Sequence, residues 1–399
     1  MRWLSAGESH GPAMGIVLEG LPAGVPLSLD RINGELSRRQ QGAGRGGRMA
    51  IEQDEVQVLA GLRHGVSLGS PLLLVVANRD HANWGSAMQA EPLAPGERAG
   101  EAVRIPRPGH ADLPGAVKYG HRDLRNVLER ASARETVNRS LAGAVALQIL
   151  EPLGIQVGAF VTALGGVEAS GESRPALDAP PTQWMPAVDA SPVSCLDPLG
   201  ETRMLERIEE ARQLGDTLGG VVELRVTGLP VGLGSHVHWD RRLDGRLGAA
   251  LLSLPAVKGL EVGDALTVAS HSGREGLDTM LPAEPGALPR RAGGRDGGLE
   301  GGMSTGETLW LRLFMKPLST LRRPLASVDL DTGEAVSAHR ERSDVCALPA
   351  LAVVAGHVAA WEMARALLES FGADQWEDVR QRVTASTLRA IRILGPASC

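Results

Sequence analysis

Short apolar runs along the chain predict buried strands. Residues 14–18 and 72–77 are largely apolar and lie close to Gly, Pro or Asn, residue types that commonly end strands. Residues 155–164, 221–226 and 308–314 have a similar strand-like composition. The first two runs are short, so the pattern favours buried strands over helices at these positions.

A helix is predicted between the first two of these strands. Residues 29–36 place three apolar side chains at helical spacing. Ser28 precedes them and is a candidate N-cap, because its hydroxyl can accept a hydrogen bond from a free backbone N–H of the first turn. The helix would run directly into Arg38 and Arg39.

Further helices are predicted in the middle and at the end of the chain. Residues 123–150 contain no proline and many good helix formers, which predicts one long helix that ends before Pro152. Residues 203–214 are amphipathic by spacing, residues 349–371 form a long alanine-rich apolar stretch, and residues 376–393 could form a last helix.

The segment 171–200 differs from these elements, since it has many prolines and few periodic apolar positions. It predicts a variable surface loop. The whole chain has 399 residues, which is longer than an ordinary domain and allows either two core units or one domain of unusual size. Strands and helices mix without strict alternation, which argues against a doubly wound parallel fold.

Composition favours a cytoplasmic protein with no nucleic-acid or membrane surface. The chain has 41 basic and 47 acidic residues, so its net charge is −6 and any basic patch must be local. Cys195, Cys346 and Cys399 are widely spaced, which indicates neither a disulfide framework nor a zinc site. Neither a signal-peptide core at the N-terminus nor an uninterrupted apolar run of membrane-spanning length is present.

The clearest candidate site is the local basic segment at residues 38–48. Its four arginines stand among small residues, so the backbone can fold tightly and direct several forked donors at one phosphate or carboxylate. The segment lacks the GxxxxGK[ST] pattern of a P-loop. A flexible, RNA-binding RGG-like segment is the alternative, although the globular flanks and the acidic net charge speak against it.

Two turns each combine a histidine with small residues. His10 lies in residues 7–11, between two glycines, and His110 follows Arg107 in residues 107–112. An imidazole can transfer protons near neutral pH, and the second turn adds a cation. Either histidine could instead be a hydrogen-bonded structural residue, but the repeated pattern favours a functional role for both.

Two further segments stay open from spacing alone. Arg130 and Arg134 lie four residues apart in the predicted long helix and would share a face that could receive an anion. The alternative is a solvated stripe paired with neighbouring glutamates. Near the end of the chain, Asp344 precedes the long apolar helix, and helix capping alone would explain it.

Taken in order, these and further segments resemble the chorismate synthase family. Any one of them is weakly specific, whereas their number and order are highly specific. The resemblance covers most of the chain and rests on residues 7–11, 38–49, 78–84, 107–112, 118–120, 128–136, 215–220, 257–261, 297–302, 316–320 and 342–344.

The resemblance implies an α+β fold and a lyase. The fold would be a single large domain, a β-α-β sandwich of antiparallel sheets with helices packed inside, assembled as a homotetramer. The activity would be the anti-1,4-elimination of phosphate from 5-enolpyruvylshikimate 3-phosphate, which gives chorismate in the shikimate pathway. Reduced FMN would be required without net redox change, and NADPH would be an indirect reductant.

The resemblance also implies roles for individual residues. His10 would assist departure of the phosphate, His110 would stabilise the reduced flavin, and Asp344 would lie near flavin N5. The substrate anions would be held by Arg39, Arg45, Arg48, Arg107 and Arg134, of which Arg39 and Arg45 match the positions implied to contact NADPH. The positions that match flavin-binding residues are Arg130, Ala131, Ser132, Pro255, Ala256, Gly301, Lys316, Pro317, Leu318, Ser319, Thr320 and Arg342.

Two positions depart from the pattern of the family. Pro255 stands where some members have a polar amide, and Arg295 and Asp296 stand where Asn-Ala is common. Two other functions compete with the lyase, namely a different phosphate-handling transferase or reductase that uses the same arginine segment, and an RNA-binding module built on residues 38–48.

Overall fold

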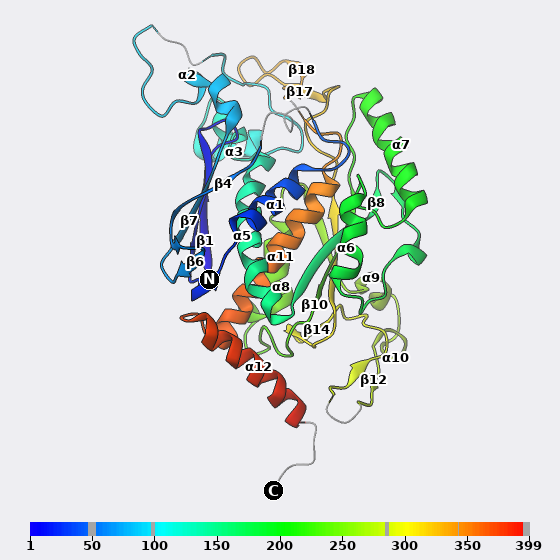
Figure 1. Ribbon diagram of the computed structural model, residues 1–399. Helices are drawn as coiled ribbons and strands as arrows, with labels where there is room; N and C mark the ends of the chain where they lie inside the picture. The colour runs from blue at the N-terminus through cyan, green and yellow to red at the C-terminus, as the bar shows by residue number, and fades with distance from the viewer. Residues whose placement is uncertain (47–52, 97–99, 284–286, 342, 394–399) are drawn as a thin grey trace.

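Two antiparallel sheets form the outer layers of the structure, and helices are packed between them (Figure 1). The computed structural model describes residues 1–46, 53–96, 100–283, 287–341 and 343–393. The arrangement is a β-α-β sandwich of the α+β class, so the fold implied by the resemblance is confirmed.

The first outer layer is a four-stranded sheet of order β1-β2-β7-β4. In β2, Met14, Ile16 and Leu18 are buried, whereas the residues between them are partly or fully exposed. This period of two places one apolar row against the helices, so a slip of one residue would turn that row towards solvent. The strands are β1 (Arg2–Ala6), β2 (Ala13–Glu19), β7 (Leu72–Ala77) and β4 (Val56–Ala60).

The second outer layer is a five-stranded sheet of order β11-β16-β10-β8-β9. Its central strands β8 and β10 are buried along most of their length, because a long helix covers one face and a shorter helix the other. The strands predicted at 155–164, 221–226 and 308–314 are confirmed as three members of this sheet. The five are β11 (Val257–Val262), β16 (Leu309–Met315), β10 (Gly220–Thr227), β8 (Gln156–Leu164) and β9 (Val167–Glu168).

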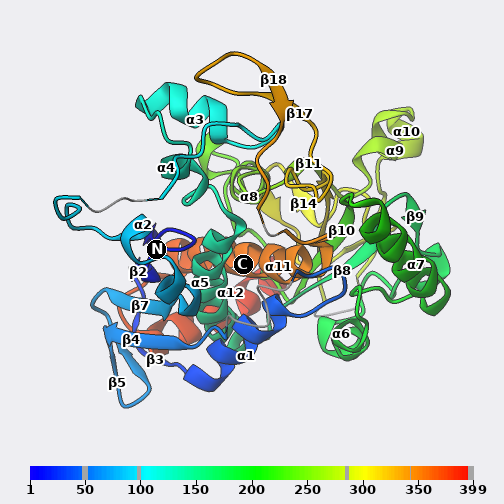
Figure 2. The same ribbon diagram turned by 90° about the horizontal axis from the view of Figure 1, so that it is seen from above.

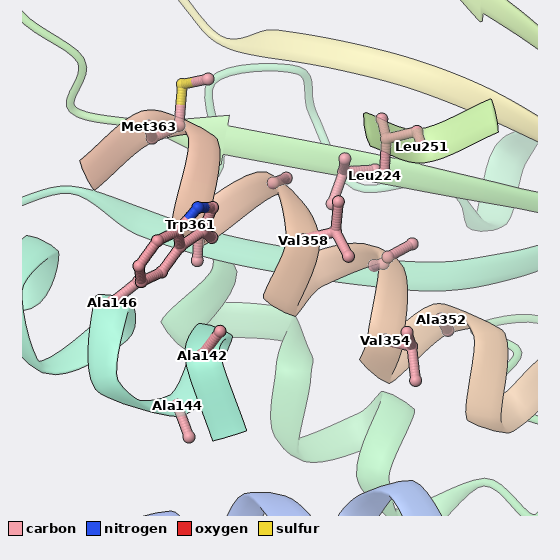
Figure 3. Close-up of a cluster of buried hydrophobic side chains, with 14 of the residues drawn as sticks. Ala142, Ala144, Ala146, Leu224, Leu251, Ala352, Val354, Val358, Trp361 and Met363 are labelled. Carbon is pink, nitrogen blue, oxygen red and sulfur yellow. The ribbon is translucent and has the colours of Figure 1, made fainter. Parts of the chain in front are cut away.

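Three helices fill the space between the sheets. α5 (Thr136–Leu150) faces β2, α11 (Leu348–Phe371) lies against β8 and β10, and α1 (Leu29–Gln40) packs on both helices. Figure 3 shows the alanines of α5 near Trp361 of α11. The two helices approach closely at Gly143, where an added Cβ would lie 2.2 Å from the Cβ of His357.

Most helix predictions are confirmed. In α1 the Ser28 side chain accepts a hydrogen bond from the backbone N–H of Arg31, as expected of an N-cap. The predicted helix at 203–214 belongs to α7 (Pro198–Leu214), which begins five residues earlier, and the last predicted helix is α12 (Trp376–Ile393).

The prediction of one helix over residues 123–150 is wrong. The segment holds α4 (Arg125–Leu128), a 3₁₀ turn (Ala133–Glu135) and α5. Ser132 interrupts the helix because its backbone is extended and its hydroxyl accepts from the N–H of Arg134. Arg130 and Arg134 therefore do not share a helix face.

The prediction of a loop over residues 171–200 is also wrong. The segment contains α6 (Pro181–Ala190), which packs on the five-stranded sheet. Trp184 and Val188 of this helix form a small core with Phe160 of β8. Pro181 stands at the start of the helix, where its missing N–H costs nothing, so this proline does not break the helix.

α11 is the one helix in the described part of the chain that is long and apolar enough to cross a membrane by length and composition. Of its most apolar window, 83% is buried inside the protein. Burial between the two sheets accounts for its apolar composition, as in the core helix of a globular protein.

Shorter elements surround the sandwich, mostly as hairpins and single helical turns. In Figure 2 the β17–β18 hairpin and α3 lie at the same edge of the view. These elements are β3 (Ala23–Pro26), β5 (Leu62–Arg63), β6 (Val66–Leu68), α2 (Gly85–Met88), α3 (Asp112–Tyr119), α8 (Leu243–Leu252), α9 (Ala265–Ala269), α10 (Gly273–Gly276), β12 (Met280–Leu281), β13 (Arg290–Arg291), β14 (Leu299–Glu300), β15 (Met303–Ser304), β17 (Ala326–Val328) and β18 (Ala335–Ser337).

Candidate active site

A cavity of about 470 Å³ lies where the first turns of α5 and α11 meet several loops. Its walls come from segments that are far apart in the sequence, and both histidine turns and part of the arginine segment contribute. The cavity is lined by Ser9, His10, Arg39, Arg45, Gly46, Arg107, Gly109, His110, Ala111, Leu128, Ala131, Ser132, Ala133, Arg134, Thr136, Leu254, Pro255, Ala256, Met315, Lys316, Leu318, Ser319, Thr320, Glu341, Ser343, Asp344, Ala347, Ala350, Leu351 and Val354.

The cavity brings together most of the residues that the sequence singled out. Arg48 and Arg342 lie outside the described residues. Pro317 falls between two lining residues but does not line the cavity itself. Arg130 and Gly301 lie away from it: Arg130 donates to the carbonyl oxygens of residues 5 and 7, and Gly301 stands in the turn between β14 and β15.

His10 is held on several sides. Its Nδ1 lies 2.9 Å from Oε1 of Glu129, and its backbone N–H donates to Oε2 of the same carboxylate at 2.8 Å. The ring centroid lies 3.9 Å from that of Trp84. On the other side of the ring, Nε2 is 4.0 Å from Oδ2 of Asp80. His10 is 7% exposed, so this turn fixes a nearly buried imidazole at the cavity wall.

His110 shares a carboxylate with an arginine. His110 Nδ1 lies 2.6 Å from Oδ1 of Asp112, while Arg107 donates from Nε and Nη2 to the same carboxylate at 2.8 and 3.0 Å. Burial acts to raise the pKa of Asp112, but the hydrogen bonds from His110 and Arg107 outweigh it and hold this pKa well below its usual range. Arg107 also donates to Thr320 at 2.9 Å, which ties the turn to the loop after β16.

A buried carboxylate joins two of the predicted anion-binding arginines. Arg39 Nη2 lies 2.5 Å from Asp54, and Arg134 Nη1 lies 2.7 Å from its other oxygen. Arg134 also donates to Asn78 at 2.9 Å. Burial lowers the pKa of Arg39 to about 10, a fall that the charge of Asp54 opposes, so the guanidinium stays positive at neutral pH. The pair of arginines and one carboxylate carries a net positive charge at the wall.

The arginine segment packs against the start of α11. Gly44 has φ +84, and a Cβ there would lie 2.9 Å from the Cβ of Cys346, so only glycine fits this close approach. Arg45 then pairs with Asp344 at 2.7 Å, and the N–H of Gly46 donates to the same carboxylate at 2.6 Å. Helix α11 begins at Leu348 with Ala347 as its N-cap, so the capping interpretation of Asp344 is wrong.

The part of the cavity wall formed by the segment after β16 combines small, apolar and hydroxyl side chains. Lys316 Nζ and the Ser319 hydroxyl both donate to the carbonyl oxygen of Gly109, at 2.6 and 2.9 Å. Burial, together with the charge of Lys258, lowers the pKa of Lys316. Leu318 and Ala256 add apolar surface to this side of the cavity. The wall therefore has one cation and several hydroxyl groups beside an apolar surface.

Three carboxylates of the site were not singled out from the sequence. Asp54 stands in a run of polar residues that looks like a solvated segment, Glu129 looks like a helix-surface partner of arginines, and Glu341 follows Arg340 in another charged run. In the structure Glu341 lines the cavity and lies 3.0 Å from His339. Their positions depend on long-range contacts, which no local pattern in the sequence indicates.

Other features of the described residues bear on cofactor chemistry. No group of three or more His, Cys, Asp or Glu side chains among them is placed to hold a metal ion. Cys195 and Cys346 are free and buried, and burial raises the pKa of Cys346 to about 11, so this thiol is protonated at neutral pH. Cys399 lies outside the described residues.

Comparison with known proteins identifies the family. The family model for chorismate synthase matches residues 1–368. The chain belongs to the chorismate synthase family. It is 54% identical over 384 residues to a chorismate synthase of Symbiobacterium thermophilum, covering 95% of this chain and 96% of that protein.

Other relatives and a solved structure agree with this family. The chain is 50% identical over 388 residues to chorismate synthase 1 of Bacillus thuringiensis, with 96% of this chain and 97% of that protein covered. A crystal structure of chorismate synthase matches with a TM-score of 0.78 and 33% identity over 98% of both chains. Chorismate synthases are carbon–oxygen lyases of the shikimate pathway, and the predicted enzyme class is confirmed.

Proposed function

We propose that the 470 Å³ cavity is the active site in which this chain converts 5-enolpyruvylshikimate 3-phosphate to chorismate with the aid of reduced FMN. The observation that carries the proposal is the convergence of Arg39, Arg45, Arg107 and Arg134 with two carboxylate-bound histidines on one cavity. A substrate with one phosphate and two carboxylates needs such a set of forked cations.

The cavity walls fit a flavin beside this substrate. Lys316 and the hydroxyl groups of Ser132, Ser319 and Thr320 would hold the flavin phosphate and ribityl chain, and the apolar surface of Leu318 would contact the ring. When bound, reduced FMN would supply electron density for departure of the phosphate and would be regenerated at the end of the cycle. The cavity volume lies within the range of about 300–1,000 Å³ that is usual for ligand sites.

The residues of this chain would position the substrate and handle its protons. The arginines would hold the three anionic groups, and each buried charge-assisted contact is worth about 1.5–3 kcal/mol. His10 would donate a hydrogen bond to the leaving phosphate, and His110 would lie beside the flavin ring. Asp344, fixed by Arg45 and the N–H of Gly46, would stand near flavin N5 and assist that nitrogen in removing the proton from C6.

A contact with NADPH through Arg39 and Arg45 is a secondary part of the proposal. Both arginines line the same cavity as the proposed substrate anions. NADPH and the substrate would therefore exclude each other at these side chains. Competition by NADPH against the substrate in steady-state kinetics measures this contact.

We also propose that the chain acts in the cytoplasm as a homotetramer. Support for assembly comes from the outer face of the four-stranded sheet, where Leu4 is 76% exposed and pairs across the strands with the partly exposed Val17. Exposed apolar residues on a sheet face are typical of subunit contacts. Sedimentation equilibrium measures the assembly, and a monomer at micromolar concentration would contradict it.

The central experiment is an anaerobic assay. The protein is mixed with reduced FMN and 5-enolpyruvylshikimate 3-phosphate, and phosphate and chorismate are measured; equal amounts of both are expected. Absence of both products would overturn the proposed function. Asp344→Asn, with flavin and substrate binding unchanged, is expected to be slow, and turnover equal to the parent would remove the role of Asp344.

The structure also weakens the RNA-binding alternative. In the described part of the arginine segment, Arg38 pairs with Glu35 and Asp189, Arg39 with Asp54, and Arg45 with Asp344. Paired and largely buried guanidinium groups are unlike a flexible basic segment that tracks a nucleic-acid backbone.

A further inference from the structure

We propose that Glu129 is a positioning residue that sets the tautomer and orientation of His10. The inference deepens the proposed function and rests on it for its kinetic consequences. Glu129 is the residue just after α4, and its side chain is 2% exposed. It reaches His10 across 119 positions of sequence, so this contact is made only by the folded chain.

The carboxylate of Glu129 faces two donors of the same residue. Oε2 accepts the backbone N–H of His10 at 2.8 Å, and Oε1 lies 2.9 Å from Nδ1 of its ring. A carboxylate can only accept hydrogen bonds. Nδ1 must therefore carry a proton in this geometry, and Nε2 is the ring nitrogen that can take up a second proton and donate it in a hydrogen bond to the leaving phosphate.

Other contacts restrain the ring and the turn without choosing the tautomer. Trp84 lies against the imidazole with a centroid distance of 3.9 Å, and the ring of His81 hydrogen-bonds to the carbonyl oxygen of His10 at 2.9 Å. Asp80 is 4.0 Å from Nε2, beyond direct hydrogen-bond distance. Within the described part of the chain, the Glu129 carboxylate is the group that contacts Nδ1, and it fixes the proton on that nitrogen.

Arg125 contacts both Glu129 and Trp84, the two side chains that hold the His10 ring. Its Nη1 lies 3.3 Å from Oε1 of Glu129, and its guanidinium carbon lies 4.9 Å from the centroid of Trp84. One cation thus contacts both groups that hold the imidazole. The carboxylate of Glu129 is held in place by donors from α4 and from the turn at His10.

The variant Glu129→Gln separates a role in the tautomer from a role in the fold. The backbone N–H of His10 is always a donor, so it takes the amide oxygen of the new side chain. The NH₂ group of the amide then faces Nδ1 and can only donate. Nδ1 is forced to accept, and the proton of the neutral ring moves to Nε2.

The experiment compares the parent, Glu129→Gln and Glu129→Asp by kinetics and by ¹⁵N NMR of labelled histidine across a pH titration. His10→Ala assigns the His10 signals. In Glu129→Gln we expect the neutral ring to change from the Nδ1–H to the Nε2–H form, and kcat to fall about 10²-fold with KM within about threefold, since the amide cannot accept from Nδ1 and so disfavours the doubly protonated ring that would donate to the phosphate from Nε2. Glu129→Asp keeps the charge and is expected to restore the Nδ1–H form and part of kcat.

A double-mutant cycle and a matched control complete the test. In the His10→Ala background Glu129→Gln should lower kcat no further, because its effect passes through His10. Glu135→Gln is the control, since Glu135 is a partly buried glutamate nearby that pairs with Arg139 at 2.8 Å and not with a histidine. It should leave kcat and the His10 signals unchanged.

The outcomes are distinct. An unchanged tautomer in Glu129→Gln, or an equal loss of kcat in the presence and absence of His10, overturns the inference and makes Glu129 a purely structural residue. Should Glu129→Gln fail to fold, as shown by thermal unfolding, the tautomer of Glu129→Asp decides, and an Nε2–H form there overturns the inference. An inactive parent contradicts the proposed function instead, while the NMR comparison still tests Glu129.

Discussion

The two histidines of the cavity are held by the same chemistry but by different parts of the chain. Nδ1 of His10 faces Glu129 from a distant segment, whereas Nδ1 of His110 faces Asp112 only two residues away. The local carboxylate is shared with Arg107, and the distant one is contacted by Arg125. A local pair can be recognised from sequence and is coupled to an anion-binding arginine, while a long-range pair is set by the fold.

The largest expected effect comes from removing each imidazole in turn. His10→Ala should lower kcat by about 10²–10⁴-fold with a small change in KM, because it removes a hydrogen-bond donor to the leaving phosphate. His110→Ala should mainly weaken binding of reduced FMN. Stopped-flow turnover and flavin titration measure the two effects. The same changes of kcat and flavin affinity in both variants would contradict the proposed division of roles.

Asp112→Asn should lower the folding stability of the protein, because Asp112 holds both His110 and Arg107. The carboxylate is buried with two partners, and removal of one member of a buried ion pair costs about 3–5 kcal/mol of folding stability. Denaturant unfolding measures this loss. Glu135→Gln, which alters a more exposed ion pair, serves as the control. Equal stabilities of the two variants would show that the buried Asp112 contributes no more to folding stability than Glu135 does.

Low pH should reduce the stability that Asp112 contributes to the turn at residues 107–112. The pKa of Asp112 is lower in the folded protein than its ordinary value of 3.8, so its contribution to stability is complete above that value and is lost as the pH falls below it towards the folded-state pKa. The parent should therefore lose more stability between about pH 5 and pH 2 than Asp112→Asn. Equal acid dependence of the two proteins would refute the assignment.

On the His10 side, Arg39→Lys should raise KM about 10–100-fold and leave kcat nearly unchanged. Lysine keeps the charge but loses the fork that contacts both Asp54 and Thr136. Initial-rate kinetics give the result. A KM equal to that of the parent would show that Arg39 does not hold a substrate anion.

The smallest effect is expected for Arg130→Ala. Arg130 donates to the backbone oxygens of Ser5 and Gly7 and does not line the cavity, in contrast to the neighbouring Ala131 and Ser132. Flavin affinity should change less than about threefold, since an exposed contact contributes about 0–1 kcal/mol. A tenfold weaker flavin affinity would instead place Arg130 at the cofactor.

Local patterns predicted much of the fold and part of the site. Apolar runs located the central strands, and Ser28 located the start of α1. The pairing of Arg107, His110 and Asp112 was accessible because all three stand in one turn. In contrast, Asp54 and Glu129 acquire their partners only when distant segments meet, and no periodicity marks such contacts.

The failed predictions have local physical causes. The composition of residues 123–150 favours a helix, but the hydroxyl of Ser132 offers the backbone an alternative bond and the helix breaks there. Proline content suggested a loop at residues 171–200, yet Pro181 lies where a helix tolerates it and Trp184 supplies apolar contact. The family resemblance, rather than spacing, supplied the individual roles at the cavity.

The near absence of space at Gly143 bears on how the cavity can move. With His357 against its backbone, α5 cannot slide or rotate on α11 without a collision, so the two helices form a stiff frame. That frame fixes the separation between Arg134, just before one helix, and Asp344, just before the other. Entry and exit of ligands must then depend on motion of the loops that line the cavity. Amide hydrogen exchange should therefore be slow in both helices and faster in those loops.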